Sequence, residues 1–307
     1  MNVEACTLFE GNFHHGVAAF ANSLYAHGYR GTIWIGYRGD LPPWASGATG
    51  DNCARYSPAA DLTLAFIPLA TKLHFTHYKP QWMLSVLAEL SPKAEALAYF
   101  DPDIVIKCRW SFFEDWISRG LAMCEDVNHY MPADHPTKLS WAEFLQQHGY
   151  QVRRTGNHYY NGGFLGVKRS AMDALETWAR LIDLVESESG SLKGWRTLDR
   201  SHRFMSANQD TLNVLAMTTP HPLSTLGPDG MDFAPGGFTM SHAIGGAKPW
   251  MKKFIRAAFG GRSPSPADKE FWNHVETPIL LYPKHGVALR RLALKMASVI
   301  GRFIRRT

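Results

Sequence analysis

Several features are scarce in this 307-residue sequence, and each absence excludes a class of protein. Its four cysteines (Cys6, Cys53, Cys108 and Cys124) are scattered without a C-x-x-C pair, which argues against a zinc knuckle or a disulfide-rich secreted scaffold. No run of about eighteen uncharged apolar residues occurs, and the N-terminus lacks the basic and apolar regions of a signal peptide. We therefore expect a cytoplasmic protein in a reducing compartment, neither secreted nor membrane-spanning.

The overall composition is that of a folded globular protein with a basic tail. Hydrophobic residues make up 45% and charged residues 19%, with a mean hydropathy of −0.21, which excludes intrinsic disorder for most of the chain. Residues 252–307 contain twelve Lys or Arg and three Asp or Glu, a net charge of +9. Subtracting this from the whole-chain +5 leaves −4 for the first 251 residues. A nucleic-acid-binding domain would carry its positive charge on the folded body, so no nucleic-acid partner is expected.

Short apolar runs alternate with helical patterns along most of the chain. This alternation predicts an α/β fold with a mostly parallel central sheet flanked by helices. Gly and Pro are frequent in residues 219–238, which we expect to form loops and short strands around a site. The expected strands are 6–9, 32–36, 61–69, 95–100 and 159–167, and the expected helices are 17–27, 79–90, 171–186 and 208–217.

The C-terminal residues are expected to form a separate extension. Residues 260–268 (GGRSPSPAD) are typical of a linker, so we predict a domain over 1–259 followed by an extension over 260–307. The segment 287–307 combines apolar residues with cations and contains no acid, which predicts a basic amphipathic helix. Such a helix can lie on an anionic membrane surface, or it can pack on the protein with a solvated basic face; we favour the membrane. Its cations are Arg290, Arg291, Lys295, Arg302, Arg305 and Arg306.

Two aspartates follow the predicted strand 95–100. Asp101 and Asp103 would lie at the carboxyl end of a parallel sheet, where ligand sites of α/β proteins form. Carboxylates in this place suit a hard divalent cation such as Mn²⁺ or Mg²⁺, which keeps other coordination positions for substrate phosphates. The alternative is an ordinary solvated acidic turn, because a D-x-D tripeptide is common by chance.

A second candidate motif, HAIGGAKPW, begins at His242. The imidazole could complete a Mn²⁺ site begun by the two aspartates. Gly245 and Gly246 would let the backbone approach a diphosphate, and Lys248 would neutralise it. Taken singly, each residue also has a structural interpretation, as a hydrogen-bonded histidine, a turn, or a surface lysine.

Four motifs in this order together resemble one family. Asp101-Pro102-Asp103, Asn161-Gly162-Gly163-Phe164, Asn208-Gln209-Asp210 and His242 to Trp250 are similar to the motifs of family 8 retaining glycosyltransferases. This family includes bacterial lipooligosaccharide galactosyl- and glucosyltransferases and glycogenin. The resemblance covers about residues 5–255. It implies the GT-A fold of nucleotide-diphospho-sugar transferases and a nucleotide-sugar donor.

The resemblance also implies a role for each matching residue. Asp101, Asp103 and His242 would hold Mn²⁺ or Mg²⁺ against the donor diphosphate. The implied donor-binding residues are Phe9, Glu10, Asn12, Phe13, Lys79, Asn161, Gly162, Gly245, Gly246 and Lys248, and the implied catalytic residues are Asn208, Gln209 and Asp210.

Two of these positions depart from the family. Phe13 lacks the hydroxyl of the family's tyrosine, so it could stack on a base without donating a hydrogen bond. Asn208 replaces the more usual aspartate, which leaves the identity of the donor sugar open.

Gln209 keeps the position that faces the anomeric carbon, but an amide is a poor nucleophile. We therefore expect front-face attack, in which the leaving phosphate takes the proton of the acceptor.

The function expected from the sequence is metal-dependent, retaining transfer of a hexose from UDP-glucose or UDP-galactose to a carbohydrate or lipid-linked acceptor of the cell envelope. A sugar-1-phosphate nucleotidyltransferase would need a Gly-rich basic loop after the first strand, and FEGNFHH at 9–15 is not one. A non-catalytic module that only binds a nucleotide sugar is the other alternative. We expect the enzyme to be cytoplasmic or peripheral on the inner face of the membrane.

Overall fold

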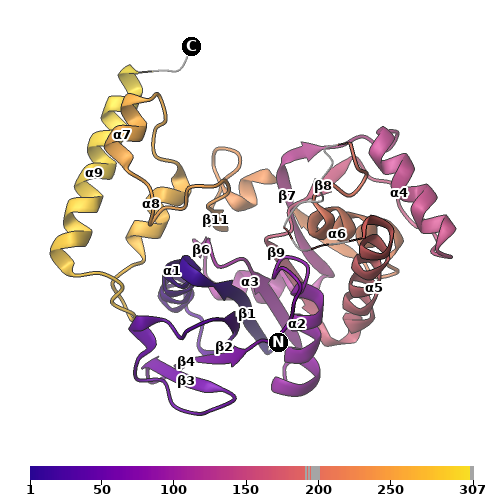
Figure 1. Cartoon of the computed structure of the whole chain (residues 1–307), viewed down its shortest axis with the longest axis horizontal. Helices are drawn as coiled ribbons and strands as arrows, with labels where there is room; N and C mark the ends of the chain where they lie inside the picture. Colours follow the sequence, from indigo (N-terminus) through magenta and orange to yellow (C-terminus); the bar gives the residue numbers. More distant parts are fainter. Residues whose placement is uncertain (191, 193, 195–200, 305–307) are drawn as a thin grey trace. The chain divides into compact units, whose positions relative to one another are not determined.

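The computed structural model describes residues 1–190, 192, 194 and 201–304. The expected fold class is confirmed, because a large sheet of mostly parallel strands is flanked by helices (Figure 1). The chain divides into two compact units. Unit 1 comprises Met1–Leu8, Leu69–Phe100 and Ser111–Pro228, and unit 2 comprises Phe9–Pro68, Asp101–Trp110 and Asp229–Thr307.

Unit 1 is built on parallel and antiparallel strand pairs. β1 (Val3–Glu10) pairs in parallel with β5 (Ala96–Phe100), which pairs antiparallel with β9 (Phe164–Lys168). β9 pairs antiparallel with β7, and β7 pairs in parallel with β10. All five residues of β5 are buried, as expected for an unbroken apolar run inside a sheet. The remaining strands are β7 (Leu121–Tyr130), β8 (His158–Tyr160) and β10 (Leu223–Leu226).

The helices of unit 1 follow their apolar periodicity. In α5 (Met172–Ser189), Leu175, Trp178 and Ile182 recur at helical spacing and are buried, and Gly190 ends the helix in the left-handed conformation with φ of 77°. The Trp178 Nε1–H donates to the Thr211 hydroxyl of α6 over 3.0 Å. The other helices are α2 (Lys79–Ser85), continued by a π-helical turn (Val86–Leu90), α3 (Trp110–Ser118), α4 (Pro136–Gln147) and α6 (Ala207–Thr218).

The expected single strand over 159–167 was wrong, because the chain turns at Asn161-Gly162-Gly163. β8 ends at Tyr160 and pairs with β7, whereas β9 begins at Phe164 and pairs with β5. The Asn161 side-chain oxygen accepts the Gly163 backbone N–H over 2.8 Å, a local bond that replaces a strand ladder. The strand pattern was correct on both sides of the turn, and the break positions the turn for a polar site.

Unit 2 contains three further strands in one ladder and a separate two-stranded ladder. β2 (Gly31–Arg38) pairs in parallel with β4 (Leu62–Pro68), which pairs antiparallel with β3 (Ala54–Ala59). β6 (Ile104–Ile106) pairs antiparallel with β11 (Met240–His242). The helices are α1 (His14–Ala26), α7 (Phe254–Phe259), α8 (Pro266–Asn273) and α9 (Lys284–Phe303).

The C-terminal helices belong to the core of unit 2. Trp250, Phe271 and Trp272 pack with Val105 of β6 and Leu294 of α9 in one cluster of buried residues. α8 begins with a capping box in which Ser265 and Asp268 satisfy each other's backbone N–H. The boundary that the sequence suggested at residue 260 stays a prediction, as does the role of the extension. Arg305 and Arg306, two of its cations, lie outside the described residues.

A buried asparagine joins α1 to the segment before α9. Asn22 is fully buried, and its amide donates to the carbonyls of His274 and Ile279, each over 2.8 Å. Its side-chain oxygen accepts the Ile279 N–H over 2.8 Å. One side chain thus satisfies three backbone groups that would otherwise be buried without partners.

Replacing this asparagine should destabilise unit 2. We expect Asn22→Ala to lower the free energy of unfolding by about 3 kcal/mol, because it leaves the three backbone groups unpaired. Urea unfolding followed by circular dichroism measures the effect. Asn273→Ala, at an exposed position of α8, is the matched control and should change stability by less than about 0.5 kcal/mol. Equal stability of the two variants would contradict this stabilising role of Asn22.

Candidate functional site

The two metal-binding motifs predicted from sequence meet through one strand pair of unit 2. Asp101 and Asp103 flank Pro102 in the turn before β6, and the Ile104 N–H donates to the Asp101 carbonyl over 3.0 Å. β11 pairs with β6 in a register that places His242 opposite Ile104. The Ala243 N–H continues this ladder by donating to the Asp103 carbonyl over 3.1 Å. Backbone pairing therefore brings together side chains more than a hundred residues apart in the sequence.

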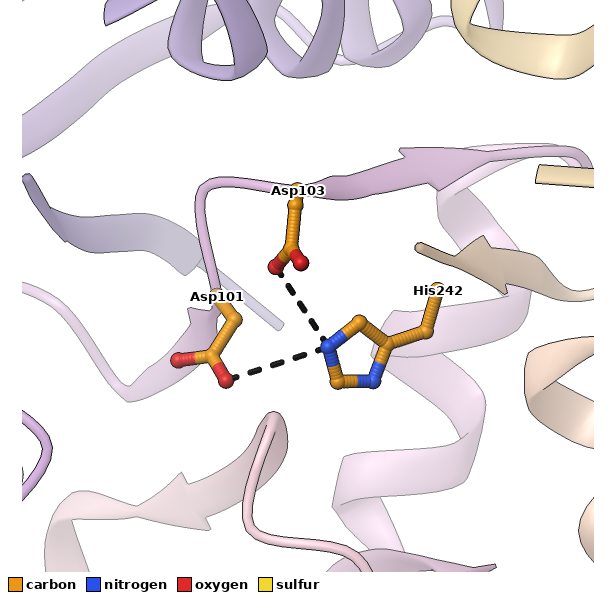
Figure 2. Close-up of side chains that lie close together, drawn as sticks. All are labelled: Asp101, Asp103 and His242. Carbon is orange, nitrogen blue, oxygen red and sulfur yellow. Dashed lines mark ion pairs between the residues drawn. The ribbon is translucent and has the colours of Figure 1, made fainter. Parts of the chain in front are cut away.

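The three side chains converge on one point, as Figure 2 shows. His242 Nε2 lies 3.4 Å from an Asp103 carboxylate oxygen and 3.9 Å from an Asp101 carboxylate oxygen. One ligand atom from each residue lies within 4.8 Å of the others. Asp103 and His242 are buried, and Asp101 is partly exposed. The cluster is therefore open toward solvent mainly at Asp101.

Lys248 provides the positive charge beside this cluster. Its ammonium donates to the second oxygen of Asp103 over 2.6 Å and to the Ala243 carbonyl over 2.8 Å. Burial would raise the pKa of Asp103, but the charges and hydrogen bonds of His242 and Lys248 outweigh it and hold that pKa well below its ordinary value. The carboxylate is therefore ionised at neutral pH.

The cluster has the donor set that a Mn²⁺ or Mg²⁺ site requires. Two carboxylates and an imidazole nitrogen match the mixed oxygen and nitrogen ligands of Mn²⁺, and three protein ligands leave positions for phosphate oxygens. Nδ1, the other ring nitrogen of His242, is buried without a hydrogen-bond partner among the described residues. The residues present therefore fit a divalent cation held by Asp101, Asp103 and His242.

A glycine of α1 allows the helix to approach the aspartate turn. A Cβ added at Gly16 would lie 2.1 Å from the Pro102 carbonyl oxygen and 3.0 Å from the ring of Trp250. No other residue fits there without moving the turn that carries both aspartates. This role could not be predicted from the sequence, because a glycine within a helical pattern ordinarily only weakens the helix.

Two predicted donor-binding elements lie close to Lys248. Gly245 has φ of +95°, which favours glycine, and both Gly245 and Gly246 face open space. The Lys248 ammonium lies 5.7 Å from the centre of the Phe13 ring, and this ring meets Trp250 edge to face at 5.6 Å. Phe13, near the N-terminus, and Trp250, at the end of the His242 motif, therefore lie side by side in unit 2.

The other predicted donor-binding residues near the N-terminus have partners of their own. Phe9 is 2% exposed and stacks on Tyr37, with ring centres 5.9 Å apart. Glu10 accepts a hydrogen bond from Arg38 over 3.0 Å, and the Asn12 amide contacts Met251 Sδ at 3.5 Å. Their roles in donor binding stay predictions.

The other predicted residues form a second polar cluster, in unit 1. The Gly162 N–H donates to the side-chain oxygen of Gln209 over 3.0 Å, and the buried Lys79 ammonium donates to the Gly162 carbonyl over 2.7 Å. A Cβ at Gly162 would lie 2.8 Å from the Asn208 side-chain oxygen. The two motifs Asn161-Gly162 and Asn208-Gln209 are thus in contact, although about fifty residues separate them.

Asp210 and Asp126 hold this cluster in place. Asp210 accepts the Tyr159 hydroxyl over 2.6 Å and the Ser206 N–H over 2.7 Å. Burial raises the pKa of Asp210 to about 7, against the two hydrogen bonds. The Asn161 amide donates to Asp126 over 2.6 Å.

Asp126 was missed by the sequence analysis. It is a buried acid near the middle of β7, separated from the apolar residues 121–124 by Glu125, and this position was the available signal. The amide nitrogen of the predicted catalytic residue Asn208 is buried without a partner among the described residues, so it can donate a hydrogen bond to a ligand.

Comparisons with known proteins give a structural match and no sequence match. Neither the family models nor the curated proteins match this chain. Among solved structures, it resembles the apo structure of WbbM, a bifunctional glycosyltransferase, with a TM-score of 0.54 and 13% sequence identity. The alignment covers 94% of this chain and 52% of the WbbM chain, so this chain spans about half the length of that protein. At this identity the likeness shows the fold, which is consistent with the GT-A type of glycosyltransferases.

Removing one candidate ligand should weaken metal binding strongly. We expect Asp103→Asn and His242→Ala each to weaken Mn²⁺ binding by about 100-fold or more, because three protein ligands are reduced to two. Electron paramagnetic resonance of free Mn²⁺ measures this affinity. Asp134→Asn removes an exposed carboxylate elsewhere and should bind Mn²⁺ like the wild type. Unchanged affinity in both site variants would contradict the assignment.

The raised pKa of Asp210 predicts how stability depends on pH. An aspartate in the unfolded chain titrates near pH 4, so between about pH 4 and 7 the folded protein binds more proton at this site. The contribution of Asp210 to stability therefore decreases as pH rises through this range. We expect the free energy of unfolding of the wild type, relative to Asp210→Asn, to fall by roughly 3 kcal/mol from pH 4 to 7 in urea titrations. A pH-independent difference would be inconsistent with this pKa.

Proposed function

We propose that this protein is a metal-dependent retaining glycosyltransferase that transfers a hexose from UDP-glucose or UDP-galactose to a carbohydrate acceptor. The observation that carries the proposal is the convergence of Asp101, Asp103 and His242 beside Lys248. The fold shared with WbbM and the order of the four family 8 motifs support the same class of reaction. The family assignment itself is part of the proposal.

The unit 2 cluster would act on the diphosphate of the donor. A Mn²⁺ or Mg²⁺ ion, when bound, supplies Lewis acidity that stabilises negative charge on the departing diphosphate. Lys248 uses two of its three N–H groups on Asp103 and Ala243, which leaves one for a phosphate oxygen. Gly245 and Gly246 leave the backbone beside it accessible. These groups stabilise the charge that develops as the sugar–phosphate bond breaks.

The unit 1 cluster would bind and orient the sugar. Asn161 is fixed by Asp126 and by the Gly163 N–H, so its position is set before any sugar binds. Asn208 has a free buried N–H donor for a sugar oxygen. Asp210 and Lys79 act by holding Tyr159 and Gly162, and through them the surrounding turn.

Retention of configuration follows best from front-face attack. The Gln209 amide oxygen already accepts the Gly162 N–H, which further weakens an already poor nucleophile. The acceptor hydroxyl would attack the anomeric carbon on the side from which the diphosphate leaves, and a phosphate oxygen would take its proton. Gln209 would stabilise the positive charge on the ring.

The place of the reaction is also proposed. We infer that the acceptor is a glycan or lipid-linked sugar of the cell envelope and that the enzyme works in the cytoplasm or at the inner face of the membrane. No helix in the described ranges has the length and apolar character needed to cross a bilayer.

Release of the nucleoside diphosphate tests this function. We expect a screen of nucleotide sugars with Mn²⁺ to give release from a UDP-hexose, abolished by a chelator and reduced about 100-fold or more in Asp103→Asn. Asp134→Asn is the matched control and should retain full activity. Equal release with and without Mn²⁺ would overturn the metal dependence.

The same assay separates the alternatives. A sugar-1-phosphate nucleotidyltransferase would consume the donor only with added pyrophosphate. A binding module would bind the donor with Mn²⁺ and release nothing. Trapping a covalent glycosyl-enzyme would overturn front-face attack.

A further inference from the structure

Helix α9 has two apolar faces, and only one of them is covered. Val287, Leu294 and Ala297 are buried in the core of unit 2, together with Trp272 of α8 and Phe254 of α7. In Figure 1, α7 lies beside α9. The helix therefore packs on its own unit, as expected from the interpretation of residues 287–307 as a helix packed on the protein.

The second apolar face is a continuous exposed stripe. Its residues recur at intervals of three and four, which places them on one side of the helix, roughly opposite the buried residues. They are between 50% and 84% exposed. A packed helix with only a solvated outer face would carry polar residues here. The stripe consists of Leu289, Leu292, Met296, Val299 and Phe303.

Positive charge borders this stripe on both sides. Lys295 and Arg302 follow one edge, together with Arg291, which is paired with Glu276 over 2.7 Å, and α9 contains no acidic residue. Along the other edge, a groove of about 560 Å³ between α7 and α9 is lined by Lys253, Arg256 and Arg290 around apolar side chains. One of these, Phe259, is 63% exposed. An apolar strip between cations is the pattern of a helix that lies in a membrane interface.

We propose that the stripe of α9 docks on a lipid bilayer that contains anionic lipids, with the helix axis parallel to the membrane plane. The stripe enters the boundary between headgroups and acyl chains, and the flanking cations contact lipid phosphates. The bilayer surface would be the place of the proposed sugar transfer, and this part of the proposal rests on the proposed function. The docking itself depends only on the apolar stripe and its flanking cations.

Charge favours the bilayer over a second copy of this chain. Two α9 helices packed stripe to stripe would bring rows of arginine and lysine together without acidic partners on the helix. An anionic lipid surface instead offers negative charge to Lys295 and Arg302. Self-association is therefore the outcome that would contradict the proposal.

Sedimentation with vesicles tests the docking surface on the full chain. The wild type should pellet with vesicles of phosphatidylcholine and phosphatidylglycerol at a ratio of about 3:1, and stay in the supernatant with phosphatidylcholine alone. High salt should release most of it. Wild-type protein that stays in the supernatant with the anionic vesicles would overturn the proposal.

Point variants avoid truncating a helix that belongs to the core. Leu292→Gln combined with Met296→Gln and Val299→Gln should reduce pelleting at least tenfold, as should Lys295→Gln combined with Arg302→Gln. Leu139→Gln, at a 51% exposed position of α4, is the matched control and should pellet like the wild type. Unchanged pelleting of the stripe variant would overturn the proposal, as would a dimer that only this variant loses in analytical ultracentrifugation.

The two proposals fail separately. All these variants should keep the melting temperature of the wild type and its Mn²⁺-dependent nucleotide release in solution. Pelleting without any nucleotide release would leave the docking surface standing and remove the glycosyltransferase. Nucleotide release without pelleting would support the glycosyltransferase and overturn the docking surface.

Discussion

Electrostatic repulsion between Asp101 and Asp103 is the constraint around which unit 2 is organised. Carboxylates held on one short turn repel each other unless cations lie nearby, and burial of Asp103 makes this more costly. Pairing of β6 with β11 brings in His242, and the same chain segment returns Lys248 to the second oxygen of Asp103. The Lys248 ammonium reduces the repulsion, and His242 adds a ring nitrogen to the two carboxylates, so the cluster could accept a divalent ion.

The polar cluster of unit 1 is organised by a different principle. The turn between β8 and β9 has backbone groups that neither strand pairs. Lys79 donates to the carbonyl of Gly162 in this turn, and Gln209 accepts its N–H. Close contact at Gly162 leaves no room for a side chain. Unit 2 thus holds a cluster of charged groups, and unit 1 holds a cluster with fixed hydrogen-bond geometry.

Much of this arrangement was predictable from the sequence because the signals were local. An acidic pair directly after a buried strand indicated the metal site, and apolar periodicity located α5 and α6. The break at Asn161-Gly162 was missed because apolar and aromatic residues continue on both sides, and only the side-chain bond to Gly163 reveals it. Gly16 and the second apolar face of α9 depend on long-range packing, which periodicity along one helix or strand cannot show.

The shared core of unit 2 has a further implication for how the chain can evolve. Val105, two residues after Asp103, and Trp250, two residues after Lys248, contact the same apolar cluster as Leu294 of α9. The core that holds α9 in place thus also supports β6, the strand that directly follows the two aspartates. Substitutions that alter the exposed surface of α9 therefore have to lie on side chains that face away from this core. A change of side-chain volume inside the core would displace α9 and β6 together.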